Sequence, residues 1–374
     1  MDKTEKLTLR ECLLGDRAFY RHVLLVVLPI IVQNTLTNVV SLLDNVMVGQ
    51  VGTLPMSGVA VVGQLLFVYN LAIWGSTSGA GIFGAQFYGR GDMDGVRHTF
   101  RFKLLVSTAI TAAAIMLFLA AGPALIGAYI SADTSPADAA ATLDYAWGYL
   151  RIMLVGLVPF GLTQCYAGTL RESGQTVLPM KASMLAMVVN FIFNALLIFG
   201  FHMGVAGAAI ATVLSQALSG LACLAFMVRR FPILRMQGAE KRFDLHSAKV
   251  LCWMGIPMGL QYSITAVGSI ILQSAVNGLG TAAIASVAAG AKLFQLICCP
   301  YDAMGSSMAT YCGQNVGACR LDRLGQGIRS CSLLGLAYAV MAFCAMLVFA
   351  DPCAMLFLNP SEPQLDLLVS LTSR

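Results

Sequence analysis

The first long apolar stretch of the sequence carries an acidic residue and a stripe of polar residues that could bind a cation. On a helix, Gln33, Thr37, Ser41 and Asp44 fall within an arc of about 80°. An ionisable residue inside such a stretch is costly and marks a functional position. We therefore predict that Asp44 marks a functional site, and that Gln33, Asn34, Thr37 and Ser41 line a substrate cavity rather than face lipid. The alternative interpretation places Asp44 at the membrane edge, solvated and without a role.

Two asparagines in a later apolar stretch could complete the same site. Asn190 and Asn194 are four residues apart, so they share one face of a helix. A carboxamide oxygen can coordinate a cation, and the adjoining NH2 group can donate to a carboxylate. We predict a functional role for both, at a depth in the membrane similar to that of Asp44. The alternative is that they only hold neighbouring helices together through hydrogen bonds.

Three other charged residues lie inside apolar stretches, namely Arg151, Lys292 and Asp302. Lys292 and Asp302 are separated by about 15 Å along a helix and by roughly 80° around it, which does not favour direct pairing. We predict that both line the substrate cavity. Lys292 could instead extend toward the membrane surface, and Arg151 is interpreted as structural.

The composition identifies the solvent of the chain as lipid. Hydrophobic residues make up 58% and charged residues only 11%, against roughly 25% charged in soluble domains, and the mean hydropathy is +0.77. Stretches of about 20 apolar residues can cross a membrane as helices. Nine such spans are expected, at residues 23–48, 58–84, 102–126, 145–168, 178–200, 204–228, 248–275, 283–311 and 328–350.

Basic residues alternate along the chain in a way that predicts its orientation. Twenty of the 23 Lys and Arg residues precede the first span or fall in every second connection, where Lys103 and Arg171 are also placed. Cytoplasmic loops carry this excess in membrane proteins. We therefore expect a multi-pass protein of the cytoplasmic membrane with its N-terminus in the cytoplasm. The net charge of +5 then reflects topology, and no nucleic-acid partner is expected.

An internal repeat predicts the domain organisation. Residues 29–94 align without gaps to residues 257–322, and fifteen of the 66 pairs are identical. Six spans separate the copies, so both halves cross the membrane in the same sense, as parallel repeats. The fold class is an all-α polytopic helix bundle of two six-helix lobes. The expected parts are a cytoplasmic segment 1–21, a first lobe 22–228, a linker 229–249 and an incomplete second lobe 250–374, about three helices short of its counterpart.

Several motifs resemble the multidrug and toxic compound extrusion (MATE) transporters. The first comprises Leu28-Pro29 together with the run Leu43-Asp44-Asn45-Val46-Met47-Val48-Gly49-Gln50-Val51-Gly52. The second comprises Val276-Asn277-Gly278-Leu279-Gly280 and Tyr311-Cys312-Gly313-Gln314-Asn315-Val316-Gly317-Ala318 in the second half. The resemblance covers essentially the whole chain. It implies twelve helices in two lobes that open alternately to each side, here with a truncated C-terminus.

The resemblance also implies a function and a role for particular residues. The family exports amphipathic, mostly cationic drugs or toxins in exchange for protons or sodium ions. Pro29 matches the proline about which the first helix bends, and Asp44 matches the cation-coupling acid of the first lobe. Asn190 and Asn194 match an Asn-x-x-x-Asp/Asn pattern that completes this site for a proton or a sodium ion, with Asn194 in place of an acid, so the resemblance leaves Asp44 as the only acid of the site. Some relatives use acids in the seventh helix, where this chain has none.

These observations predict a secondary active transporter rather than an enzyme. No spacing typical of a metalloprotease, a serine hydrolase or a phosphate-binding loop is present. No cofactor is expected beyond the coupling ion, and the complete protein is expected to be monomeric. Two alternatives stay open: a flippase for lipid-linked oligosaccharides with a related architecture, and an inactive truncated fragment.

Overall fold

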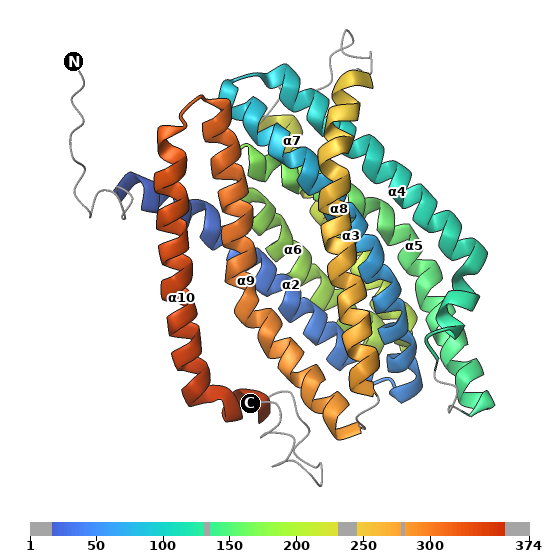
Figure 1. The fold of residues 1–374 in the computed structure, drawn as a ribbon. Helices are drawn as coiled ribbons and strands as arrows, with labels where there is room; N and C mark the ends of the chain where they lie inside the picture. Colours follow the sequence, from blue (N-terminus) through green and yellow to red (C-terminus); the bar gives the residue numbers. More distant parts are fainter. Residues whose placement is uncertain (1–16, 131–134, 231–244, 278–280, 356–374) are drawn as a thin grey trace, which may run out of the picture. The chain divides into compact units, whose positions relative to one another are not determined.

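The computed structural model describes residues 17–130, 135–230, 245–277 and 281–355, and every regular element in these ranges is a helix (Figure 1). The elements are α2 (Arg17–Gly49), α3 (Thr53–Arg90), α4 (Met93–Gly127), α5 (Pro136–Glu172), α6 (Val177–Asn194), the π-helix η1 (Ala195–Gly200), α7 (Gly204–Arg230), α8 (Leu245–Asn277), α9 (Thr281–Gly317) and α10 (Asp322–Met355). Each expected apolar span falls inside one helix or, for the fifth span, inside α6 and η1 together. The all-α fold class is therefore confirmed.

The helices have the length and the surface of membrane-spanning segments. Within the described residues, six of them are long and apolar enough to cross a bilayer, with mean hydropathies from 1.4 to 2.3. Large apolar side chains lie on the outside, including Trp253 at 77% exposure and Leu347 at 70%. An apolar exterior of this kind is stable only against lipid. The chain is a multi-pass membrane protein.

Local sequence signals set the helix ends around the second connection. Gly91 follows α3 with φ of 79°, a left-handed conformation that glycine adopts at little cost and that commonly ends a helix. Asp92 then caps α4, because its carboxylate accepts a hydrogen bond from the backbone N–H of Gly95 at 2.9 Å. A turn of two residues is therefore enough to reverse the chain.

The prolines inside the expected spans do not end their helices. Pro29 lies within α2, Pro159 within α5, Pro257 within α8 and Pro300 within α9. Proline is tolerated at such positions in membrane helices, where neighbouring groups satisfy the freed carbonyls.

The largest apolar core joins α3, α4 and α5. Val62 and Ile73 of α3 and Leu150 of α5 are completely buried there. The core also contains Tyr69, whose hydroxyl lies 2.9 Å from the hydroxyl of Thr111 and donates to the Leu157 carbonyl at 2.9 Å. These hydrogen bonds satisfy a polar group that would be costly to bury alone.

The chain forms two compact units, and α2 and α8 each contribute to both. One unit holds residues up to Ile31 and from Ile264 onward, and the other holds Val32–Ser263. In the first unit the beginning of α2 packs on α9, with Ile31 in the same cluster as Ala303. In the second unit the beginning of α8 packs on α3. The predicted lobes 22–228 and 250–374 follow the repeat instead and remain a prediction.

The two helix contacts occupy equivalent positions of the internal repeat. Ile31 in one unit corresponds to Gly259 in the other, and Ala303 corresponds to Gly75, since the members of each pair are 228 positions apart. A Cβ atom on Gly75 would come within 2.6 Å of the Cα atom of Gly259, so the backbones of α3 and α8 are in direct contact. The repeat seen in sequence is therefore also a repeat of packing.

Candidate functional site

Asp44, Asn190 and Asn194 form a single hydrogen-bonded cluster within one unit. Asp44 is half-buried on α2, and the two asparagines are buried on α6. The Asn194 Nδ2 atom donates to Asp44 Oδ1 at 2.5 Å and to Asn190 Oδ1 at 3.1 Å. The structure thus brings together the three residues predicted to bind the coupling cation. Their role in coupling remains a prediction.

The carboxamide oxygen of Asn194 gives this cluster an unused acceptor. The side chain is fully buried, and its Oδ1 atom has no hydrogen-bond partner in the described part of the chain. Asn194 is also the last residue of α6, directly before the π-helix η1 (Ala195–Gly200), and such π-helical turns are frequent at functional sites. A buried carbonyl oxygen without a donor can accept a hydrogen bond from the neighbouring carboxyl group when that group is protonated. It can also coordinate a small cation together with the carboxylate.

Two further residues belong to the surroundings of the cluster and were not predicted from sequence. Thr212 of α7 accepts a hydrogen bond from Asn190 Nδ2 at 3.4 Å, while its own hydroxyl donates to the Ala208 carbonyl at 2.9 Å. Tyr149 of α5 packs with Val48, four residues after Asp44, in a shared apolar cluster. Neither residue has a distinguishing sequence pattern, because both lie in ordinary apolar helical stretches.

Of the polar stripe on α2, Gln33 as well as Asp44 forms side-chain hydrogen bonds to other helices of the unit. Gln33 donates from Nε2 to the Ser183 hydroxyl at 2.9 Å and accepts from Arg171 at 3.4 Å. Thr37 is exposed, and its hydroxyl donates to the backbone carbonyl of Gln33. Ser41 is exposed as well. Asn34 is half-buried. The assignment of these residues to a substrate cavity remains a prediction.

Asp302, Lys292 and Pro29, which were also predicted as functional residues, lie in the other unit. Asp302 is exposed on α9. Lys292 belongs to the same helix, but its side chain lies outside the described residues. Pro29 is buried on α2, two residues before the point where that helix passes from one unit to the other.

A buried ion pair between Lys103 and Glu172 was not predicted. Lys103 of α4 is 1% exposed, and its Nζ atom contacts both carboxylate oxygens of Glu172, the last residue of α5. Glycines on α3 make room for the pair, since a Cβ atom on Gly81 or Gly84 would collide with the carboxylate. Lys103 and Arg171, which the sequence placed in the connections between apolar spans, both belong to helices, because α4 begins before and α5 ends after the corresponding apolar stretch.

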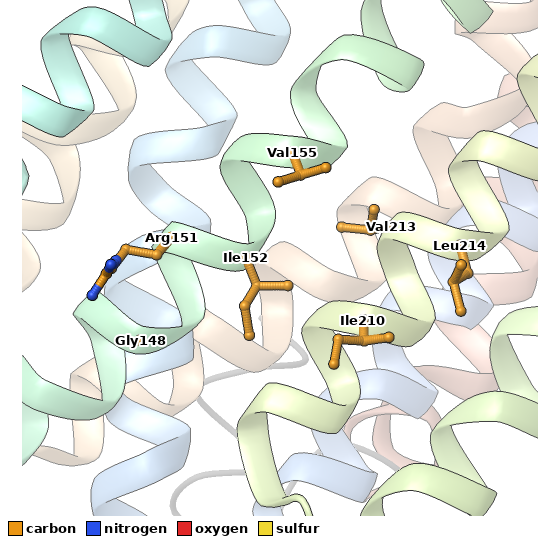
Figure 2. Close-up of a pocket in the computed structure, with 7 residues that line it drawn as sticks. All are labelled: Gly148, Arg151, Ile152, Val155, Ile210, Val213 and Leu214. Atoms are coloured by element: carbon orange, nitrogen blue, oxygen red, sulfur yellow. The ribbon is translucent and has the colours of Figure 1, made fainter.

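A groove lies between α5 and α7 in the same unit, with a volume of about 580 Å³. It is lined by Gly148, Arg151, Ile152, Val155, Ile210, Val213 and Leu214. Figure 2 shows Ile152 of α5 and Ile210 and Val213 of α7 between the two helices, with Arg151 extending away from them. The groove is therefore apolar with one cation at its edge.

A multi-pass all-α fold with an internal repeat and a polar cluster between its helices is typical of membrane transporters. The family is given by a direct match: residues 29–196 and 257–374 match the family model described as MatE. The chain belongs to the MatE family, and the resemblance seen in its sequence is confirmed.

Curated relatives are named mainly for drug resistance. The probable multidrug resistance protein YpnP of Bacillus subtilis is 32% identical over 173 residues, which cover 45% of this chain and 38% of the relative. The probable multidrug resistance protein YoeA of the same organism is 24% identical over 356 residues, covering 92% and 74%. A further relative is named as an FAD transporter of Shewanella oneidensis, 26% identical over 52% of this chain and 44% of the relative. The chain thus aligns to between 38% and 74% of the length of these proteins.

Solved structures share the fold. One described as an outward-facing conformation of a multidrug resistance MATE family transporter gives a TM-score of 0.85 at 20% identity, covering all of this chain and 81% of that one. Another, described as MATE in the straight conformation, gives a TM-score of 0.86 at 18% identity, covering 97% and 79%.

Proposed function

We propose that this protein exports small amphipathic, mostly cationic compounds from the cell in exchange for protons or sodium ions. The observation that carries the proposal is the buried cluster of Asp44, Asn190 and Asn194 in a chain of the MatE family. Relatives named as multidrug resistance proteins support export of drug-like substrates. We place the protein in the cytoplasmic membrane as a monomer with a cytoplasmic N-terminus.

The unpaired oxygen of Asn194 suggests how the site would hold its ion. A proton on Asp44 would turn the carboxylate into a donor, and the acid could then donate to Asn194 Oδ1 while the Asn194 amide still donates back. A sodium ion would be held by the carboxylate together with carboxamide oxygens, the hard oxygen ligands that such cations prefer. Either ion satisfies the buried acceptor that is otherwise without a partner.

Ion binding would then change the interaction of Asp44 with a cationic substrate. An ionised Asp44 attracts a positively charged compound in a low-dielectric cavity, whereas a neutralised Asp44 does not. We propose that neutralisation also bends α2 at Pro29, close to the Ile31–Val32 division of that helix between the two units. Coupling the ion state to the helix shape would provide alternating access.

The proposal is tested with the purified chain in liposomes, using ethidium as a fluorescent cationic substrate. A pH gradient or a sodium gradient is imposed, and the one that drives transport identifies the coupling ion. We expect Asp44→Asn to abolish gradient-driven transport. The matched control is Asp144→Asn, the same chemical change at an exposed position of α5, which should transport normally. Transport by Asp44→Asn at the wild-type rate would refute the role of this carboxylate.

A binding measurement separates the ion site from transport. If sodium binds the cluster, it should raise the melting temperature of the wild-type chain, since a ligand stabilises the folded state that binds it. It should not raise that of Asp44→Asn. A sodium-dependent stabilisation that survives in Asp44→Asn would place the ion elsewhere.

A further inference from the structure

The groove between α5 and α7 has the polarity of a phospholipid. Its walls are aliphatic side chains, among them Val155, which is 67% exposed, and Leu214, which is 43% exposed. The only charged residue that lines it is Arg151. No carboxylate of the described residues lies within ion-pair distance of this guanidinium. A cation without a counter-charge beside an apolar bed suits a ligand with an anionic head and a hydrocarbon chain.

The position of Arg151 along α5 matches the depth of a lipid headgroup. The apolar part of α5 is expected at residues 145–168, so Arg151 lies about 9 Å inside its beginning. An arginine side chain is long enough to reach the headgroup layer from this depth. Val155 lies one turn deeper on the same helix. The guanidinium and the apolar wall are therefore ordered as the head and chain of a lipid in the leaflet where α5 begins.

Two glycines shape the groove. Gly148 lines the groove three residues before Arg151, and an added Cβ atom there would meet nothing within 4 Å, so the space beside it is open. At Gly156, next to the lining residue Val155, an added Cβ atom would come within 2.8 Å of Val213. Close packing at Gly156 therefore brings α5 and α7 together, while the missing side chain at Gly148 leaves space in the groove.

We propose that this groove binds one anionic phospholipid, with its phosphate on Arg151 and one acyl chain along Val155, Val213 and Leu214. A zwitterionic lipid carries its own ammonium group beside the phosphate, so its phosphate interacts more weakly with the arginine. A charge-assisted contact of this type corresponds to a preference of roughly tenfold for the anionic lipid. The inference does not depend on which substrate the protein transports.

The test uses photoreactive phosphatidylglycerol and phosphatidylcholine with identical diazirine-bearing chains. Each is incorporated into liposomes with the 374-residue chain, and the labelled residues are located by mass spectrometry. We expect phosphatidylglycerol to label residues 152–155 and 210–214 roughly tenfold more than phosphatidylcholine. Equal labelling by the two lipids, or no labelling of these residues by either, would overturn the proposal.

Variants separate the charge from the shape of the site. Arg151→Gln should lower phosphatidylglycerol labelling to the phosphatidylcholine level, and Arg151→Lys should preserve the preference. Gly148→Leu should reduce labelling by both lipids, because the new side chain would fill part of the groove that Gly148 lines. Arg229→Gln, at an exposed basic residue near the other end of α7, is the control and should change nothing. The proposal fails if Arg229→Gln lowers the labelling as much as Arg151→Gln, or if Arg151→Gln leaves it unchanged.

Discussion

Breaking the buried ion pair between Lys103 and Glu172 should destabilise the protein strongly. The lysine is 1% exposed and the glutamate side chain 13%, so little solvent is available to compensate a lost partner. Removing one member of such a pair typically costs about 3–5 kcal/mol, because the remaining buried charge loses its main counter-charge. For Lys103→Met this corresponds to a fall in melting temperature on the order of 10 °C. Glu172→Gln should have a cost of similar size.

The double variant Lys103→Met/Glu172→Gln makes this a decisive test. With both charges gone, neither is left unpaired, so the double variant should be more stable than the sum of the two single losses predicts. The assay is thermal unfolding in detergent with a thiol-reactive fluorophore. Exposed thiols, among them Cys252, Cys319 and Cys344, are blocked beforehand, so that the signal reports exposure of buried free thiols such as those of Cys165 and Cys223. Strictly additive losses would refute the reasoning, because they would mean that the two side chains do not stabilise each other.

Three other predictions concern packing and hydrogen bonding. Gly75→Ala should lower the melting temperature markedly, because its methyl group would collide with the backbone of Gly259, whereas Gly63→Ala, on the same helix with open space around it, should not; thermal unfolding of both checks this. Tyr69→Phe should cost about 1–3 kcal/mol, since it leaves buried partners unsatisfied; an unchanged midpoint would contradict it. Asn194→Ala should raise the ion concentration for half-maximal ethidium transport by roughly tenfold or more, through loss of the amide donor to Asp44; a wild-type concentration dependence would argue against it.

The membrane-spanning helices were predictable because the bilayer imposes a simple rule. A backbone in lipid must satisfy its own hydrogen bonds, so every apolar stretch of sufficient length becomes a helix. All nine expected spans lie inside helical segments of the structure. The ends were less predictable, since α4 and α5 continue as helices through polar residues. Glu172 lies beyond the expected span 145–168, which is why its burial was not recognised.

The sequence by itself determined which residues are costly to bury in lipid, and it therefore singled out Asp44, Asn190 and Asn194. It also determined the repeat, because equivalent positions keep similar residues. Only the tertiary structure decided which of these residues meet, since Asp44 and Asn194 are 150 positions apart and contact depends on how α2 packs on α6. The same holds for Thr212, for the Lys103–Glu172 pair and for Arg151 beside its groove. Hydrophobicity along a chain specifies helices, but the neighbours of a side chain are set by packing in three dimensions.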